Sequence, residues 1–91
     1  MKWSVYIIRC TDDSLYTGIS TDVYRRFSQH SDQKGAKYFR GRQPEELVYI
    51  ETKPDRSSAS KRESAIKKLK RLEKLLLISS ETNKLNDFSS Y

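Results

Sequence analysis

The sequence places three ionisable side chains where its hydrophobic pattern predicts core. Arg26 and His30 share one helical face with apolar residues, and Glu63 shares another on a later helix. A desolvated charge is costly unless it has a partner or a ligand. Together with Tyr6 and Tyr16, these residues suit phosphodiester chemistry. An arginine can stabilise a pentacoordinate phosphate, a carboxylate can hold one Mg²⁺ ion, and a phenol or imidazole can handle the proton of water.

Each of these residues also has an ordinary structural explanation, and the sequence leaves both interpretations open. Arg26 could form a salt bridge with Glu63, and His30 could make a core or capping hydrogen bond. Glu63 could instead pair with Lys67, one helical turn later. The two tyrosines are residue types that strands favour in any case.

Other catalytic classes lack their motifs in this sequence. There is no glycine-rich phosphate loop, no HExxH and no pair of cysteines, which argues against P-loop nucleotide hydrolysis and against zinc hydrolysis. No serine lies in a glycine-flanked elbow, as a serine nucleophile assisted by His30 would require. The single cysteine, Cys10, is expected to be a small buried filler.

The pattern predicts three strands that must carry part of this set. Residues 2–10 alternate with apolar side chains on both sides, which is typical of a central strand. A turn at 11–14 leads into a second strand at 15–19, so the two are expected to form a hairpin. Residues 47–50 are expected to form the third strand.

The register of this hairpin decides whether the tyrosines can act together. If the loop holds an odd number of residues, Tyr6, Tyr16 and Gly18 share one face of the hairpin. An even number separates Tyr6 from the other two, and the sequence does not choose between these arrangements.

Helices are predicted in two regions. The first follows cap residues at 20–22 and runs from Val23 to His30. The second opens near residue 56, but its apolar stripe drifts too far around the axis for one straight helix. We therefore expect a break between residues 67 and 71 and two consecutive helices.

A chain of 91 residues fits one small domain. Its apolar runs are far too short to cross a membrane, and the amino end does not resemble a signal peptide, so a cytoplasmic location without membrane contact is expected. Residues 79–91 are rich in serine and asparagine. We expect them to be a flexible polar tail with at most one apolar contact to the body.

The formal net charge of +6 is unevenly distributed. Residues 1–55 carry 9 basic and 8 acidic side chains, whereas residues 56–91 carry 9 basic and 4 acidic ones. Clustered lysine and arginine favour a polyanionic partner such as nucleic acid, although a solvated basic helix would look the same. The residues expected to contact nucleic acid are Lys34, Lys37, Arg40, Arg42, Lys61 and Lys67.

These motifs together resemble the GIY-YIG nuclease superfamily. Ser4-Val5-Tyr6 and Tyr16-Thr17-Gly18 match its two strand motifs, and the sequence then continues to Arg26, His30 and Glu63. The resemblance covers roughly residues 3–78. It is strongest to small stand-alone bacterial members that are similar to the amino-terminal nuclease domain of the bacterial repair excinuclease.

The resemblance implies an α+β fold, with a small three-stranded antiparallel sheet flanked by helices, over residues 1–78. It also implies roles for the tyrosines and the glycine. Tyr6 would be the general base or would position water, and Tyr16 would line the site. Gly18 would let backbone and phosphate approach closely.

The remaining roles belong to the two helices. Arg26 would stabilise the transition state, and His30 would assist proton transfer or hold Tyr6. Glu63 would carry a single Mg²⁺ or Mn²⁺ ion. Whether Tyr6 or His30 takes the proton stays open at this stage.

The sequence departs from the family pattern in several places. Ser4 replaces the first glycine and Thr17 the isoleucine of the second motif. The asparagine that often follows the metal-binding glutamate has no clear counterpart, because Asn83 and Asn86 lie in the polar tail. A second, DNA-binding domain is also absent, so specificity is expected to depend on a protein partner.

Three functional hypotheses follow. The first is a metal-dependent endonuclease that cuts DNA in repair or processing, with RNA as the other nucleic acid that these residues admit. The second is a nucleic-acid binding module of the same fold that cuts weakly or not at all, for which Glu63→Ala would leave binding intact or strengthen it. The third is an adaptor that docks through the helix at 72–78, unless that face is core.

Overall fold

The computed structural model describes residues 2–31 and 43–85. Three strands and three helices follow one another along the chain. They are β1 (Trp3–Cys10), β2 (Leu15–Ser20), α1 (Val23–Ser31), β3 (Pro44–Lys53), α2 (Arg56–Lys67) and α3 (Arg71–Ile78). The basic connection between α1 and β3 falls largely outside the described residues.

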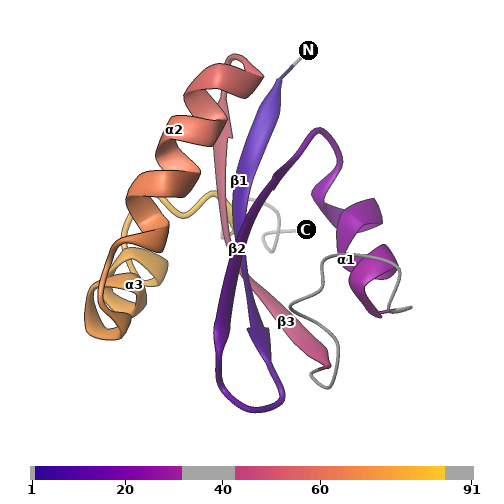
Figure 1. The fold of residues 1–91 in the computed structure, drawn as a ribbon, viewed down its shortest axis with the longest axis vertical. Helices are drawn as coiled ribbons and strands as arrows, with labels where there is room; N and C mark the ends of the chain where they lie inside the picture. Colours follow the sequence, from indigo (N-terminus) through magenta and orange to yellow (C-terminus); the bar gives the residue numbers. More distant parts are fainter. Residues whose placement is uncertain (1, 32–42, 86–91) are drawn as a thin grey trace.

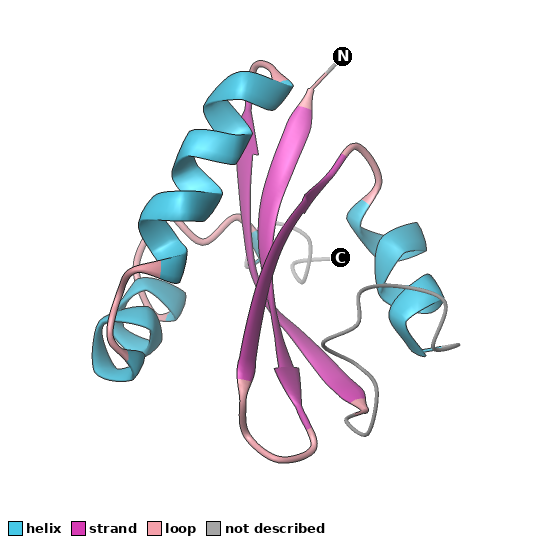
Figure 2. Cartoon of the chain, viewed as in Figure 1, coloured by secondary structure: helices cyan, strands magenta, loops and turns pink. Residues whose placement is uncertain are grey.

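The strands form one antiparallel sheet in the order β2-β1-β3, so the predicted central strand is confirmed. Side chains of β1 are buried on both sides, because α1 covers one face of the sheet while α2 and α3 cover the other (Figures 1 and 2). The fold is the α+β class that the resemblance implied.

Two apolar clusters fill the spaces between the sheet and its helices. On the α1 face, the buried cluster comprises Tyr6, Ile8, Cys10, Val23 and Ile50. On the other face, it comprises Val5, Ile7, Tyr49, Ala59 and Ile66. Each fully buried isoleucine contributes about 1.5–3 kcal/mol relative to an exposed one. Alternate residues of β1 serve the two clusters, which is why this strand has an almost continuous apolar run.

The hairpin register gives the shared face that an odd loop predicts. Leu15 pairs with Arg9, and Tyr6 lies directly opposite Gly18. Asp13 adopts a left-handed conformation (φ 67°) in the turn, where Asp12 accepts a hydrogen bond from the backbone of Ser14. As a result, Tyr6 and its neighbours on β2 project toward α1.

Side-chain caps and an interruption define the helices. Asp55 caps α2 by accepting a hydrogen bond from the Ser58 amide at 2.8 Å. After the last residue of α2, the chain leaves helical geometry at Lys70, whose amide donates to Glu73 at 2.8 Å. The predicted break is therefore confirmed, and it lets α3 turn its apolar residues back toward the sheet.

The described part of the tail, residues 79–85, is not loose as expected. The buried Asn83 amide donates to the carbonyls of Val48 and Ile78 at 2.9 and 2.8 Å, and its oxygen accepts from the Ile50 amide at 3.2 Å. The Lys84 amide also donates to the Ile50 carbonyl at 2.8 Å. These bonds fasten the segment along the outer edge of β3, so the polar composition reflects hydrogen bonding to the sheet.

Candidate functional site

Gly18 lets a phenol lie against the backbone of β2. A Cβ atom at this position would stand 2.6 Å from Tyr6 Oη and 2.7 Å from Tyr6 Cζ, which are impossibly short contacts. It would also stand 3.2 Å from the ring of Tyr16. We expected Gly18 to admit a phosphate, but the close approach that the structure shows is that of Tyr6.

The Tyr6 hydroxyl meets the buried imidazole of His30. Tyr6 Oη lies 3.1 Å from His30 Nε2, and neither residue is more than 1% exposed. Tyr16 completes the ring cluster, with its ring edge-on to His30 at a centroid distance of 5.3 Å. Three residues distant in sequence thus form one aromatic group between the hairpin and the last turn of α1.

The environment keeps this pair neutral. Burial lowers the pKa of His30 to about 4, and the positive charge of Arg26 acts in the same direction. Burial raises the pKa of Tyr6 well above its ordinary value, and the neighbouring Tyr16 raises it further, while Arg26 opposes the shift by favouring the phenolate. At neutral pH a protonated phenol therefore lies beside an unprotonated imidazole.

Arg26 stands at the border of this group. Its side chain is half-buried, and Nη1 donates to Gln29 Oε1 at 3.1 Å. The guanidinium lowers the pKa of Tyr16 as well, although burial of that phenol outweighs it and the net shift is upward. Arg26 thus supplies a positive charge that acts on both tyrosines.

Glu63 acts on the same tyrosines from the other side of the sheet. Its carboxylate charge helps to raise the pKa of Tyr6 and of Tyr16, after burial as the main cause. The helix that carries it, α2, packs against β2, the edge strand that holds Tyr16. The five predicted site residues therefore converge on the β2 edge of the sheet.

The structure decides between the simple explanations of these charges. Within the described residues, Glu63 pairs with Lys67 at 3.5 Å, and Arg26 bonds to Gln29. The expected alternative, a salt bridge from Arg26 to Glu63, does not form between the two helices. His30 does make a core hydrogen bond, as its structural explanation required, but its partner is the candidate catalytic Tyr6.

Glu63 fits a divalent ion that keeps most of its water. Its carboxylate is partly accessible, with 23% of the side chain exposed. No cluster of three or more histidine, cysteine or acidic residues occurs in the described parts of the chain. A hard cation such as Mg²⁺ is commonly held by one or two carboxylates together with water and substrate phosphate, so this single donor suits it.

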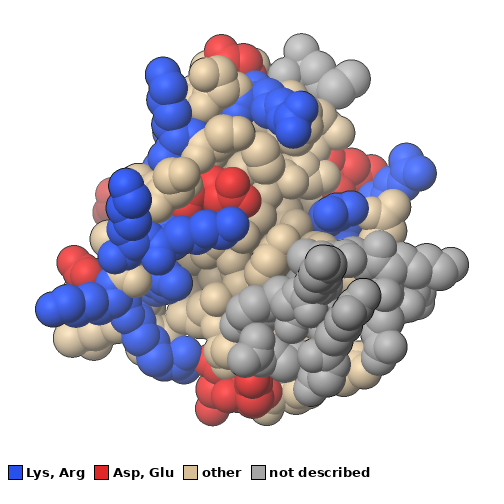
Figure 3. Space-filling view, in the orientation of Figure 1, with Lys and Arg blue, Asp and Glu red and all other residues tan. Residues whose placement is uncertain are grey.

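The candidate nucleic-acid contacts are only partly visible. Lys61 and Lys67 are exposed on α2, on the side of the molecule where lysine and arginine surround a small acidic patch (Figure 3). The other four residues lie outside the described residues, namely Lys34, Lys37, Arg40 and Arg42.

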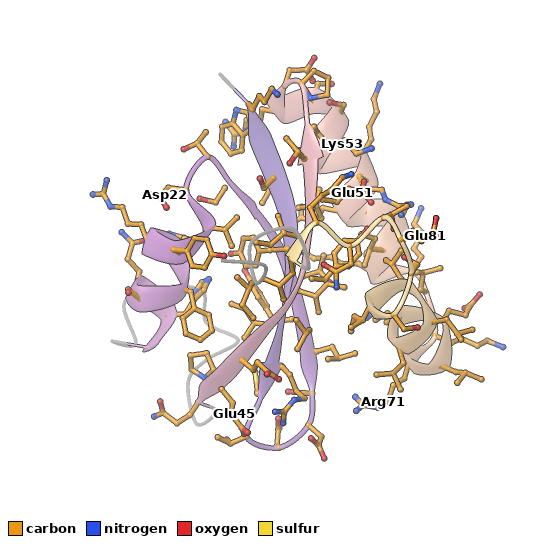
Figure 4. The ribbon with its side chains drawn as sticks, turned by 180° about the vertical axis from the view of Figure 1, so that it is seen from behind. Asp22, Glu45, Glu51, Lys53, Arg71 and Glu81 are labelled. Atoms are coloured by element: carbon orange, nitrogen blue, oxygen red, sulfur yellow. The ribbon has the colours of Figure 1, made fainter. Side chains whose placement is uncertain are left out.

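Sequence reasoning missed a second polar group, on the face of the sheet that α2 covers. Glu51 accepts a hydrogen bond from Tyr49 Oη at 2.5 Å, two from Arg62 Nε at 3.1 and 3.0 Å, and an ion pair from Lys53 at 2.9 Å. Figure 4 shows Glu51 and Lys53 on β3 beside α2. The alternation that puts Tyr49 and Glu51 on one face was the available signal.

A family-model comparison matches residues 2–75 to the GIY-YIG catalytic domain. The chain belongs to the GIY-YIG family. All of the residues that converge at the β2 edge fall inside the matched range. The GIY-YIG domain is a nuclease domain, which implies action on DNA, and its members commonly use divalent metals. The resemblance inferred from the sequence motifs is confirmed.

Relatives of similar length support this membership. A UPF0213 protein of Desulfotalea psychrophila is 54% identical over 77 residues, covering 84% of this chain and 70% of that protein. A UPF0213 protein of Clostridium perfringens is 46% identical over 84 residues, covering 92% and 90%. The names of these GIY-YIG relatives state no activity.

The fold is also found in a solved structure of the same group. The solution NMR structure of a UPF0213 protein from Bacillus halodurans matches with a TM-score of 0.59 and 40% identity, covering 98% of this chain and 95% of that one. Among the described residues of the present GIY-YIG chain, no helix is long and apolar enough to cross a membrane.

Proposed function

We propose that the protein is a metal-dependent endonuclease that hydrolyses phosphodiester bonds in DNA. The observation that carries the proposal is the contact of 3.1 Å between Tyr6 Oη and His30 Nε2, beside Arg26 and within the field of Glu63. A buried tyrosine needs no such neighbours for packing alone. Their charges and hydrogen-bonding atoms match the needs of phosphodiester hydrolysis.

The neutral pair provides a route for the proton of the attacking water. Tyr6 Oη accepts that proton while its own proton passes to His30 Nε2, which accepts it when the ring hydrogen is on Nδ1. Tyr6 never becomes a free phenolate, which burial would oppose. This relay resolves the choice between Tyr6 and His30 as the base, because both take part, and general base catalysis of this kind contributes about 10²–10⁴-fold.

Arg26 and Glu63 serve the phosphate. The guanidinium of Arg26 stabilises the negative charge that grows on the pentacoordinate phosphorus, where its planar fork suits two oxygens. Glu63 would hold the divalent ion, Mg²⁺ or Mn²⁺, which supplies positive charge at the phosphate oxygens when bound. The phosphorus–oxygen bond to the leaving sugar then breaks, and the departing alkoxide takes a proton from solvent.

Basic residues would hold the DNA backbone across this edge. Lys61 and Lys67 project from α2, and we extend this role to Lys34, Lys37, Arg40 and Arg42 as a proposal. Such contacts position a duplex without reading its sequence, so specificity for repair or processing intermediates would come from DNA shape or from a protein partner.

A second candidate is a binding module of the same fold that cuts weakly. The ion pair between Lys67 and Glu63 favours it, because a carboxylate that already faces an ammonium group holds a metal ion less tightly. This candidate predicts salt-dependent DNA binding with no cleavage in Mg²⁺ or Mn²⁺.

Cleavage of labelled branched, nicked and linear DNA in Mg²⁺ or Mn²⁺ separates the two. We expect cutting by the wild type and its loss in Arg26→Ala and Glu63→Gln. The matched controls are Arg25→Ala, which removes an exposed arginine from the same helix, and Glu81→Gln, which removes an exposed carboxylate after α3. Binding without cutting on every substrate would favour the second candidate.

A further inference from the structure

One face of α3 carries exposed leucines. Leu72, Leu75 and Leu76 are 68%, 42% and 63% exposed, and their spacing puts them on one side of the helix. The opposite side packs on the sheet through Leu77 and Ile78. Single exposed leucines are ordinary, but adjacent ones on one helix turn form an apolar patch of the kind that marks an interaction site. We call these three residues the α3 leucine face.

Basic side chains surround this face. Residues 67–74 contain Lys67, Lys68, Lys70, Arg71 and Lys74 but only one acid, Glu73. Glu73 is occupied in accepting the hydrogen bond from the Lys70 amide. Arg71 is held over the hairpin turn, where Nη1 donates to the Asp13 carbonyl at 2.6 Å. Figure 3 shows lysine and arginine gathered on the side formed by α2 and α3.

We propose that the α3 leucine face is the docking surface for an acidic amphipathic segment of another protein. Leucine or aromatic side chains of that segment would cover the leucine face, and its carboxylates would lie against the basic rim. This combination of an apolar centre with a complementary charged border is the usual composition of a specific protein interface.

Charge and topology favour this occupant over three others. A second copy of the chain would bring two basic rims together, which is repulsive. A DNA backbone could meet the lysines, but it offers no apolar surface to the leucines. The carboxyl-terminal residues of the chain itself follow Leu85, which packs on the α1 side of the sheet, away from α3.

The surface is separate from the candidate site. The leucine face belongs to α3 and points away from the sheet, whereas the tyrosines and His30 lie on the α1 face. A partner docked on α3 would therefore leave the β2 edge open to DNA. The proposal stands on this surface alone and does not require the nuclease activity.

A peptide selection tests the proposal with a defined probe. A phage-displayed library of random peptides would be selected on the immobilised wild type at low salt, with counter-selection on the double variant Leu72→Ser/Leu76→Ser. Tyr24→Ser, which removes a 53% exposed aromatic from α1, is the matched control. Circular dichroism should show all three proteins folded, because the substituted side chains are exposed.

We expect enriched peptides that combine apolar residues at helical spacing with several aspartates or glutamates. Their synthetic forms should bind the wild type and Tyr24→Ser equally and bind the double variant at least tenfold more weakly. Lys70→Glu/Lys74→Glu should also weaken binding, and added salt should do the same.

Several results would overturn the proposal. Failure to enrich any peptide, enrichment of basic peptides, or equal binding to the double variant would each do so. Concentration-dependent dimers that the leucine substitutions abolish would assign the face to a second copy. Peptide binding that appears only after deletion of residues 86–91 would assign it to the chain's own tail, and loss of DNA binding in the double variant would assign it to DNA.

Discussion

At the scale of single residues, the sequence predicted which side chains matter better than how they meet. Arg26, His30 and Glu63 could be found because they interrupt apolar helical faces. The contact between Tyr6 and Gly18 could not be found, because it depends on a hairpin register that composition does not fix. The pairing of His30 with Tyr6 also depends on where α1 crosses the sheet, which only the packed fold determines.

Gly18→Ala should damage both stability and activity. The added Cβ would meet Tyr6 Oη at 2.6 Å, so the phenol must move away from His30. We expect a loss of about 1–3 kcal/mol in the free energy of unfolding, measured with urea, and a large loss of cleavage. Thr17→Val is the control from the opposite face of β2.

Thr17 should behave in the opposite way. Its buried hydroxyl has no hydrogen-bond partner among the described residues, so an apolar group of the same shape removes a desolvation cost. We expect Thr17→Val to be neutral or to add up to about 1 kcal/mol of stability. If Gly18→Ala proved as stable as Thr17→Val, the close packing of Tyr6 on β2 would be wrong.

His30 should make the folded state sensitive to mild acid. The unfolded imidazole titrates near 6.5, but burial, aided by Arg26, lowers the folded pKa to about 4. Between these values the unfolded chain binds more protons, so stability is full above pH 6.5 and falls as the pH decreases toward 4. The expected loss between pH 7 and pH 5 is about 2 kcal/mol.

Urea unfolding of the wild type and of His30→Gln across that range checks this expectation. The variant should be less stable at pH 7, because it disturbs a buried contact, but its stability should change little with pH. An equal decline in both proteins would show that His30 is not the group that titrates.

At the scale of elements, periodicity succeeded where elements are apolar and failed where they are polar. The drifting stripe of leucines predicted the break between α2 and α3. The ends of β3 were missed, because Glu45, Glu46 and Glu51 make the flanks of this strand look like loop. The segment around Asn83 was missed for a similar reason, since its polar side chain serves the backbone of β3.

The contact between β3 and α2 should depend on one buried carboxylate. Burial would raise the pKa of Glu51, but hydrogen bonds from Tyr49 and Lys53 and the charge of Arg62 outweigh it and hold that pKa below its ordinary value. We expect Glu51→Gln to lower the free energy of unfolding by about 1–3 kcal/mol at pH 7. This contribution is present at neutral pH and is lost as acid protonates the carboxylate.

Glu46→Gln is the matched control for that measurement. Glu46 lies on the same strand and pairs with Arg9 at 3.4 Å, but its side chain is 60% exposed. Surface pairs are worth little, so this substitution should change stability by less than about 1 kcal/mol. Equal effects of the two substitutions would mean that the buried network does not hold α2 against the sheet.

At the scale of the whole molecule, the uneven charge of the chain becomes one basic side. The sequence indicated the excess of lysine and arginine beyond residue 55, and the fold gathers much of it over α2 and α3 (Figure 3). The sequence did not show that α1 and α2 cover opposite faces, because nothing in it fixes which face each helix takes. That arrangement places Glu63 and Arg26 on either side of the edge strand.

The most direct test of the account is DNA cleavage under single-turnover conditions by Tyr6→Phe, compared with Tyr49→Phe. Each substitution removes one buried phenolic oxygen, but only that of Tyr6 contacts His30. We expect Tyr6→Phe to remain folded and to cut about 10²–10⁴-fold more slowly, with Tyr49→Phe close to the wild type. A cleaving wild type whose rate is unchanged in Tyr6→Phe would contradict the proton relay.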